Sequence, residues 1–118
     1  MTNERKKKLA EELQDQLDGI ASYAKPGDET QVALLVDNIA FMGAELTALR
    51  EDIAEKGAVM MVTNGNNITT MGANPSVKVY NTMMKTLINS LDQLKRFVPE
   101  AVSAGSALIE FIRAGKPE

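Results

Sequence analysis

Two segments of the chain carry apolar residues at alternating steps of three and four, which is the spacing of one face of an α-helix. The first runs from about Glu29 to Lys56 and the second from about Pro75 to Phe97. The apolar positions are Val32, Leu35, Ile39, Met42, Leu46, Leu49 and Ile53 in the first segment, and Val77, Tyr80, Met84, Leu87, Leu91, Leu94 and Val98 in the second. Each set forms a heptad seam, so the pattern predicts an antiparallel pair of long helices.

Residues that begin and end helices mark both segments. Asp28 together with Gln31 predicts a capping box at the start of the first helix, and Gly57 is suited to follow its last turn. Asn74 predicts the N-cap of the second helix, with Pro75 in its first turn. The bounds of the pair are therefore predicted independently of the apolar pattern.

The stretch from Lys56 to Pro75 is longer than the ~2–8 residues that usually connect two helices. Val59 to Thr63 and Ile68 to Met71 are apolar runs that favour β-structure, and Asn64 to Asn67 lie between them. Asparagine and glycine tolerate the positive φ angles of tight hairpin turns. The stretch therefore predicts a β-hairpin over about residues 58–72, at the tip of the helix pair.

A shorter amphipathic segment lies on each side of the pair. Residues 3–24 predict an N-terminal helix that ends before Lys25-Pro26-Gly27, and residues 100–114 predict a short C-terminal helix. Further apolar residues beside the seams, such as Val36 and Ile88, indicate that the long helices have more than one neighbour. We expect one domain, residues 1–118, that is mainly α, with the hairpin inserted in the long-helix pair and a helix flanking each side.

Composition excludes several kinds of catalytic site. The chain has no cysteine and no histidine, which excludes disulfides, thiolate nucleophiles, Ser-His-Asp triads and the common zinc sites. It also lacks a Gly-x-x-x-x-Gly-Lys-Ser/Thr phosphate loop and an evident acidic metal cluster. We therefore expect no enzyme activity, no cofactor and no metal. Because we find neither an apolar run of ~18 residues nor a leader, we expect a cytoplasmic protein without membrane contact.

The residues around the hairpin form an ordered series of motifs. Leu-Arg-Glu-Asp-Ile-Ala-Glu-Lys-Gly at 49–57 precedes an apolar strand and an Asn-Gly turn at 64–65, and Asn-Pro at 74–75 opens a helix with Lys78, Asn81 and Leu91. This series, over roughly Leu34 to Leu94, resembles the small subunit of tailed-phage terminases. In that family an L-R-x-x-I-x-x-x-G helix end leads through a short strand pair to N-P and a further helix.

The resemblance implies a non-catalytic component of viral DNA packaging that acts in the cytoplasm of the bacterial host. Such a protein assembles into a homo-oligomer, often a ring, binds double-stranded viral DNA at the packaging-initiation site and regulates the large terminase subunit. A different hypothesis fits the same helical pattern. The chain can also be a helical protein–protein interaction or assembly module that never binds DNA.

Candidate DNA contacts come from two groups of cations. Arg5, Lys6, Lys7 and Lys8 form the one dense basic run, in the first turns of a helix, where cations oppose the helix dipole. A phosphate-binding arm explains such a run, and the alternative is a loose, solvated terminus. Arg113 and Lys116 are candidates for a second patch with Lys85, Lys95 and Arg96, although cations near helix C-termini also complement the dipole.

The hairpin is the candidate oligomer interface, because its first strand is apolar on both faces. The predicted interface residues are Val59, Met60, Met61, Val62, Ile68 and Met71. A neighbouring subunit would cover the face that the helices leave open. The alternative is that both faces are buried within one chain, under the N-terminal or the C-terminal helix.

Overall fold

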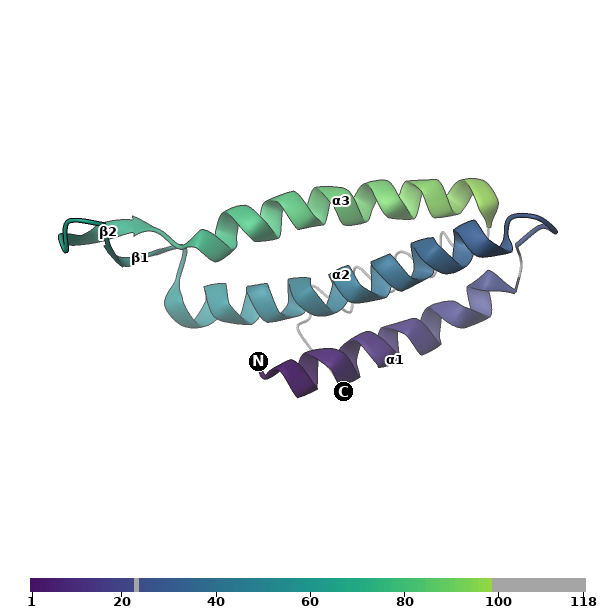
Figure 1. Ribbon diagram of the computed structural model, residues 1–118, viewed down its shortest axis with the longest axis horizontal. Coiled ribbons are helices and arrows are strands. Elements are labelled where there is room, and N and C mark those ends of the chain that lie inside the picture. Colours follow the sequence, from purple (N-terminus) through teal and green to yellow (C-terminus); the bar gives the residue numbers. More distant parts are fainter. Residues whose placement is uncertain (23, 99–118) are drawn as a thin grey trace.

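The computed structural model describes residues 1–22 and 24–98. Along the chain lie α1 (Asn3–Ala21), α2 (Glu29–Lys56), β1 (Val59–Thr63), β2 (Thr69–Ala73) and α3 (Pro75–Phe97) (Figure 1). The protein is thus mainly helical, with an antiparallel two-strand hairpin between its second and third helices, as the sequence predicts. The predicted helix at 100–114, which includes Arg113, lies outside the described residues, and so does Lys116.

The middle helix, α2, packs against both α1 and α3 and lies between them (Figure 1). Its buried residues are Val32, Val36, Ile39, Ala40, Met42, Gly43, Ala44, Leu46 and Thr47. This set is wider than the predicted seam, since Val36, Ala40 and Ala44 are buried while Leu49 is only half-buried. A helix with a neighbour on each of two sides needs a broad apolar surface, and the small alanines allow close approach.

The core joins all three described helices. Its buried side chains are Leu9, Leu13 and Leu17 of α1, the apolar residues of α2, and Leu87, Leu91 and Leu94 of α3 with Val98 after it. Tyr80 and Met84 pack against this cluster at its edge. The core therefore lies along the helices, and the hairpin is outside it.

The start of α2 differs from the prediction. Asp28 has φ −100° and ψ −5°, close to helical values, and its side chain makes no capping hydrogen bond. Its backbone N–H donates to Lys25 O in the preceding turn, and its carbonyl accepts from Val32 N. A capping side chain needs an extended residue from which to reach back. The capping box of Asp28 and Gln31 was therefore a wrong prediction, although the helix does begin at Glu29.

The other ends follow local chemistry. Gly57 has φ +84° and its N–H donates to Ile53 O, so a glycine ends α2 as expected. At the start of α3, Asn74 is extended and its side chain accepts from Ser76 N, with Pro75 in the first turn, which confirms the predicted cap. The first helix ends at Ala21 rather than residue 24, because the Ser22 hydroxyl donates to Gly19 O at 2.7 Å and competes with continued helix.

One expectation about apolar length needs correction. By length and composition alone, α2 is apolar enough to cross a membrane, and 50% of its most apolar window is buried inside the protein. A helix that packs between two others has the same composition, because it buries side chains on two sides. The expectation that the chain contains no apolar run of this length was therefore wrong.

Candidate interaction surface

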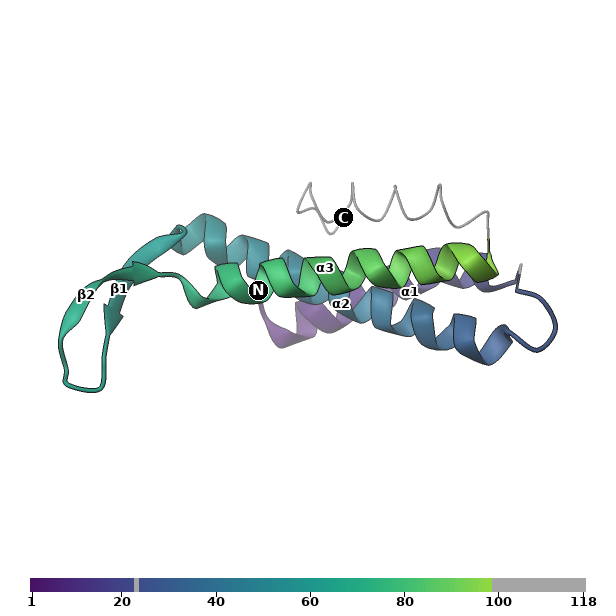
Figure 2. The same ribbon diagram turned by 90° about the horizontal axis from the view of Figure 1, so that it is seen from above.

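The hairpin extends beyond the ends of α2 and α3 along their axis (Figure 1) and bends out of the layer of helices (Figure 2). Its strands pair antiparallel, with Met61 opposite Met71 and Thr63 opposite Thr69. The two threonine hydroxyls lie 2.8 Å apart in a cross-strand hydrogen bond near the turn. This register places Val59, Met61 and Met71 on one face, because side chains alternate along a strand.

The apolar side chains of the hairpin are open to solvent on both faces. Met61 is 56% exposed and Met71 is 62% exposed on the first face, and Val62 is exposed on the second. Of the six predicted interface residues only Met60 is half-buried, and Val59 and Ile68 are exposed like the others. Burial of both faces within one chain, which was the alternative, is not found in the part of the chain that the structure describes. Contact with a second subunit stays a prediction.

The turn of the hairpin is organised by the side chain of Asn64. Its Oδ1 accepts from Asn66 N at 2.8 Å and from Ile68 N at 3.1 Å, while Asn64 N donates to Ile68 O at 2.9 Å. Asn67 adopts the positive φ, at 60°. Because these bonds hold Ile68 in the turn, the second strand begins at Thr69, one residue later than the apolar run suggests.

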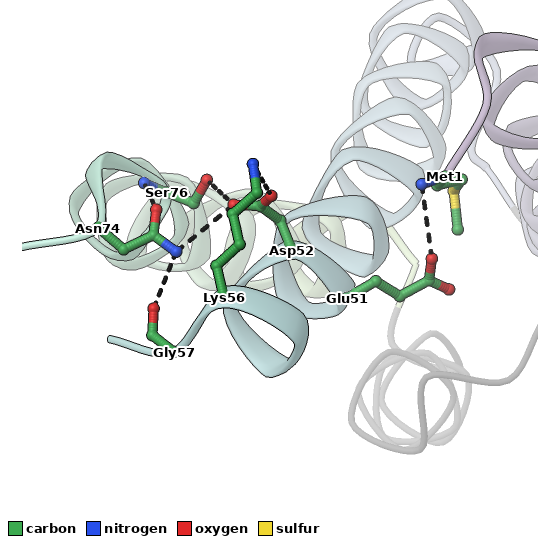
Figure 3. A network of polar contacts seen from close by, with 7 residues as sticks. All are labelled: Met1, Glu51, Asp52, Lys56, Gly57, Asn74 and Ser76. Carbon is green, nitrogen blue, oxygen red and sulfur yellow. Dashed lines mark hydrogen bonds and ion pairs between the residues drawn. The ribbon is translucent and has the colours of Figure 1, made fainter. Parts of the chain in front are cut away.

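A buried asparagine anchors the base of the hairpin (Figure 3). Asn74 is 2% exposed, and its side-chain Nδ2 donates to Gly57 O at 2.9 Å and to the Asp52 carboxylate at 3.5 Å. Its backbone N–H donates to Ala58 O at 2.8 Å. These bonds join the end of α2 to the start of α3 and fix the direction in which the two strands leave the helices.

Asp52 gathers charge and hydroxyl partners at the same place (Figure 3). Its carboxylate accepts from Ser76 Oγ at 2.6 Å and pairs with Lys56 Nζ at 2.9 Å. The Ser76 hydroxyl and then Lys56 lower the pKa of Asp52, and Asp52 in turn raises the pKa of Lys56. The carboxylate also lies beside the first turn of α3, where the helix dipole favours a negative charge. Sequence spacing reveals the Asp52–Lys56 pair, but it gives no signal for the bond to Ser76 across the hairpin.

Charge is absent from the hairpin itself. No Asp, Glu, Lys or Arg occurs between Lys56 and Lys78. The hairpin consists of methionine, valine, isoleucine, threonine, asparagine, glycine and alanine, which suits binding to a neutral partner. We compared the chain with protein-family models, curated proteins and solved structures, and nothing matches it.

The basic run lies on the first turns of α1, against α2. Lys6 Nζ pairs with Glu45 at 3.0 Å, and Arg5 pairs with Glu51 at 3.6 Å. The terminal amine of Met1 is also 3.8 Å from Glu51 (Figure 3). These pairs join residues that are far apart in sequence, and they were not predicted because no spacing rule indicates such contacts. They give Arg5 and Lys6 a role in packing.

The other two cations of the run have different surroundings. Lys7 borders a groove between α1 and α2 together with Glu11, Asp15 and Asp37. Lys8 is exposed, and within residues 1–22 and 24–98 it forms no ion pair with a carboxylate. The structure thus divides the predicted DNA-binding run into Arg5 and Lys6, which pair with carboxylates of α2, and Lys7 and Lys8, which are exposed and form no ion pair within the described residues. Contact with DNA stays a prediction for all four.

Proposed function

We propose that this protein is a non-catalytic component of viral DNA packaging, similar to a terminase small subunit, that acts as a homo-oligomer in the cytoplasm of the bacterial host. The observation that carries the proposal is the anchored hairpin with exposed apolar side chains on both faces, between helices whose motifs resemble that family. In this proposal α2 and α3 act as one long antiparallel pair, with the hairpin at its tip. Helix α1 and the predicted helix at 100–114 flank the pair within a single domain.

The physical case for oligomerisation starts from exposed apolar surface. Burying one valine or methionine side chain fully is worth about 1.5–3 kcal/mol, and the hairpin exposes several of them. A two-stranded hairpin without cover is marginally stable in water. The Asn74 and Asp52 bonds hold its base in one orientation, which lowers the entropy lost when a partner binds. Association would therefore stabilise the hairpin.

DNA binding in this proposal comes from Arg5, Lys6, Lys7 and Lys8, with Arg113 and Lys116 as further candidates. The formal net charge of −3 makes the whole chain a poor ligand for phosphate, so contact has to be local. An oligomer presents several copies of the run at once, which multiplies a weak contact. Regulation of the large terminase subunit, the proposed partner that cuts and translocates DNA, requires no catalytic group in this chain.

One observation favours a second candidate function. Arg5 and Lys6 are already paired with Glu51 and Glu45, so part of the basic run is used within the chain. A helical protein–protein interaction or assembly module that never binds DNA needs only those packing contacts and the apolar hairpin. The two candidates share oligomerisation or partner binding through the hairpin and differ in the role of Lys7 and Lys8.

Binding to duplex DNA at several salt concentrations separates the candidates. We expect the affinity of the wild-type oligomer to fall steeply with salt, because each phosphate contact releases counterions. Lys8→Glu should weaken binding and flatten the salt dependence. The matched control is Lys25→Glu, which reverses another exposed lysine, in the loop before α2. Equal losses of DNA affinity in both variants would show that the attraction is diffuse and does not involve a specific contact by Lys8. If the wild type does not bind DNA even at low salt, the assembly module is favoured.

A further inference from the structure

A groove runs between α2 and α3 on the surface of the helical layer. Met42 contributes one wall, and Val79, Thr82, Met83 and Thr86 of α3 contribute the other. The groove has a volume of about 400 Å³, and Lys78 is the one charged residue among those that line it. Val79 is 48% exposed, so the groove presents an apolar side chain directly to solvent.

The same pair of helices forms a second groove nearer to the start of α2. It is lined by Gln31, Leu34, Leu35, Asn38, Gln93 and Phe97, none of which is charged. Leu34 is exposed, so this groove also presents an apolar side chain to solvent. Both grooves lie between the same two helices, and together they are called the α2–α3 track, in which Lys78 is the one charged lining residue.

The hairpin of the same chain does not fill this track. It leaves the helices at their common end and projects away from them (Figure 1), and the Asn74 and Asp52 bonds fix it there. Each chain therefore presents one apolar, uncharged projection and one apolar, nearly uncharged groove. Within the described residues, the hairpin and the groove of one chain do not contact each other.

We propose that the hairpin of one copy docks in the α2–α3 groove of a second copy. The inference rests on the proposed oligomerisation and names the surface that receives the hairpin. Their chemistry matches, because the hairpin carries no charge and the groove has one charged lining residue, Lys78, whose long side chain can keep its ammonium group in water. Their sizes also match. A strand of 5 residues spans about 17 Å at ~3.4 Å per residue, and α3 covers about 21 Å from Val79 to Gln93 at ~1.5 Å per residue.

This contact joins two different surfaces, so it is heterologous and can repeat from chain to chain. Such contacts close into rings when the rotation between copies allows it and otherwise grow into filaments. Because the contact is apolar and nearly uncharged, salt screening has little effect on it. The oligomer should therefore persist at salt concentrations that abolish binding to DNA.

Lysine substitutions with matched controls test the two surfaces. Met71→Lys alters the hairpin, and its control, Thr70→Lys, lies on the opposite face of the same strand. Val79→Lys alters the groove, and its control, Ile88→Lys, changes an α3 residue that is 45% exposed and lies outside the groove. We expect Met71→Lys and Val79→Lys to raise the concentration needed for assembly at least about tenfold. Both controls should assemble like the wild type. Circular dichroism verifies folding.

A mixing experiment distinguishes this contact from a hairpin–hairpin contact. In an equimolar mixture, the Val79→Lys chain supplies an intact hairpin and the Met71→Lys chain supplies an intact groove. These two surfaces can dock once, so the mixture should form a two-chain species and no larger assembly. As a second measurement, Met71→Cys and Val79→Cys chains mixed under air, with dissolved oxygen as the oxidant, should form a mixed disulfide because docking brings the two thiols together. The wild type contains no cysteine that could compete.

The outcomes keep the two proposals separate. If the wild type is a monomer, oligomerisation and the docking contact both fail. If the wild type assembles while Val79→Lys assembles equally well and the mixed disulfide is missing, the docking contact is overturned and oligomerisation stands.

Discussion

Ser76 Oγ donates a 2.6 Å hydrogen bond to the carboxylate of Asp52, which lies on the preceding helix on the other side of the hairpin. Asn74 donates to the same carboxylate at 3.5 Å and to Gly57 O at 2.9 Å. The end of α2 and the start of α3 are thus joined by one small polar network. The network determines how the apolar hairpin is presented to a partner, so it links the fold to the proposed function.

We expect Ser76→Ala to raise the pKa of Asp52 toward its ordinary value of 3.8, because the hydroxyl is the first cause of its lowered pKa. Titration of the Asp52 carboxyl carbon by NMR measures this directly. Ser90→Ala, on the same helix but away from the network, should leave the value as it is in the wild type. An unchanged titration in Ser76→Ala would show that the hydroxyl does not hold the carboxylate in solution.

The lowered pKa of Asp52 also sets the pH range in which the network stabilises the fold. A depressed carboxyl pKa contributes stability that is fully present above the unfolded value of 3.8 and is lost as pH falls through the lower folded value. The stability difference between wild type and Asp52→Asn should therefore shrink below pH 3.8 and stay constant toward neutral pH. Urea unfolding at a series of pH values checks this. A difference that changes near neutral pH would contradict it.

Replacing Asn74 should destabilise the protein at the base of the hairpin. Asn74→Ala removes a helix cap and leaves buried polar groups without partners, at a cost of about 2 kcal/mol in the free energy of unfolding. Asn74→Asp keeps the cap to Ser76 N but places an oxygen opposite Asp52 and Gly57 O, so we expect it to be no less damaging at neutral pH. Denaturant unfolding of both variants measures the cost, and a stable Asn74→Asp would refute the donor role of Nδ2.

Gly57 is required by its backbone conformation. With φ +84° and ψ 168° it lies in a region that only glycine enters without strain, so Gly57→Ala should cost about 1–3 kcal/mol. The matched control is Gly65→Ala in the hairpin turn, because Gly65 has no positive φ and nothing lies within 4 Å of an added Cβ. Comparable unfolding curves for the two alanine variants would contradict this account of how α2 ends.

The pairing of Lys6 with Glu45 leads to a prediction about both stability and DNA. Glu45→Gln removes a partly exposed ion pair, so we expect a loss of at most about 1 kcal/mol. It also releases Lys6, so DNA affinity at low salt should rise several-fold above that of Glu55→Gln, which removes the same charge from an exposed position. Equal affinities of the two variants would argue against a phosphate contact by Lys6.

The ends of helices could be predicted from the sequence where the backbone geometry of a single residue determines them. The bounds of α2 and α3 coincide with those expected, because Gly57, Asn74 and Pro75 act through their own backbone geometry. The predicted capping box at Asp28 was wrong because the backbone of Asp28 is close to helical geometry. A sequence pattern does not reveal this geometry. The hairpin was recognisable, but Asn64 shifted the start of its second strand by binding Ile68 N.

Contacts between distant residues were beyond sequence reasoning. The apolar residues beside the seam predicted more than one neighbour for α2, but they did not include Ala40, Ala44 and Thr47, whose burial was not predicted. Lysine, glutamate, serine and aspartate are common on helix surfaces, and nothing in their spacing indicates that Lys6 would meet Glu45 or that Ser76 would meet Asp52. Five of the six predicted interface residues of the hairpin are open to solvent, and their contact with a second subunit stays a prediction.

The central claim is that the anchored hairpin makes this chain assemble with copies of itself, and the mass in solution tests it most directly. Light scattering behind size exclusion, over a range of concentrations and at low and high salt, should give a species several times larger than the 12.8 kDa chain. Met71→Lys should shift that species toward the single chain. A wild type that stays at 12.8 kDa under all these conditions would contradict the claim.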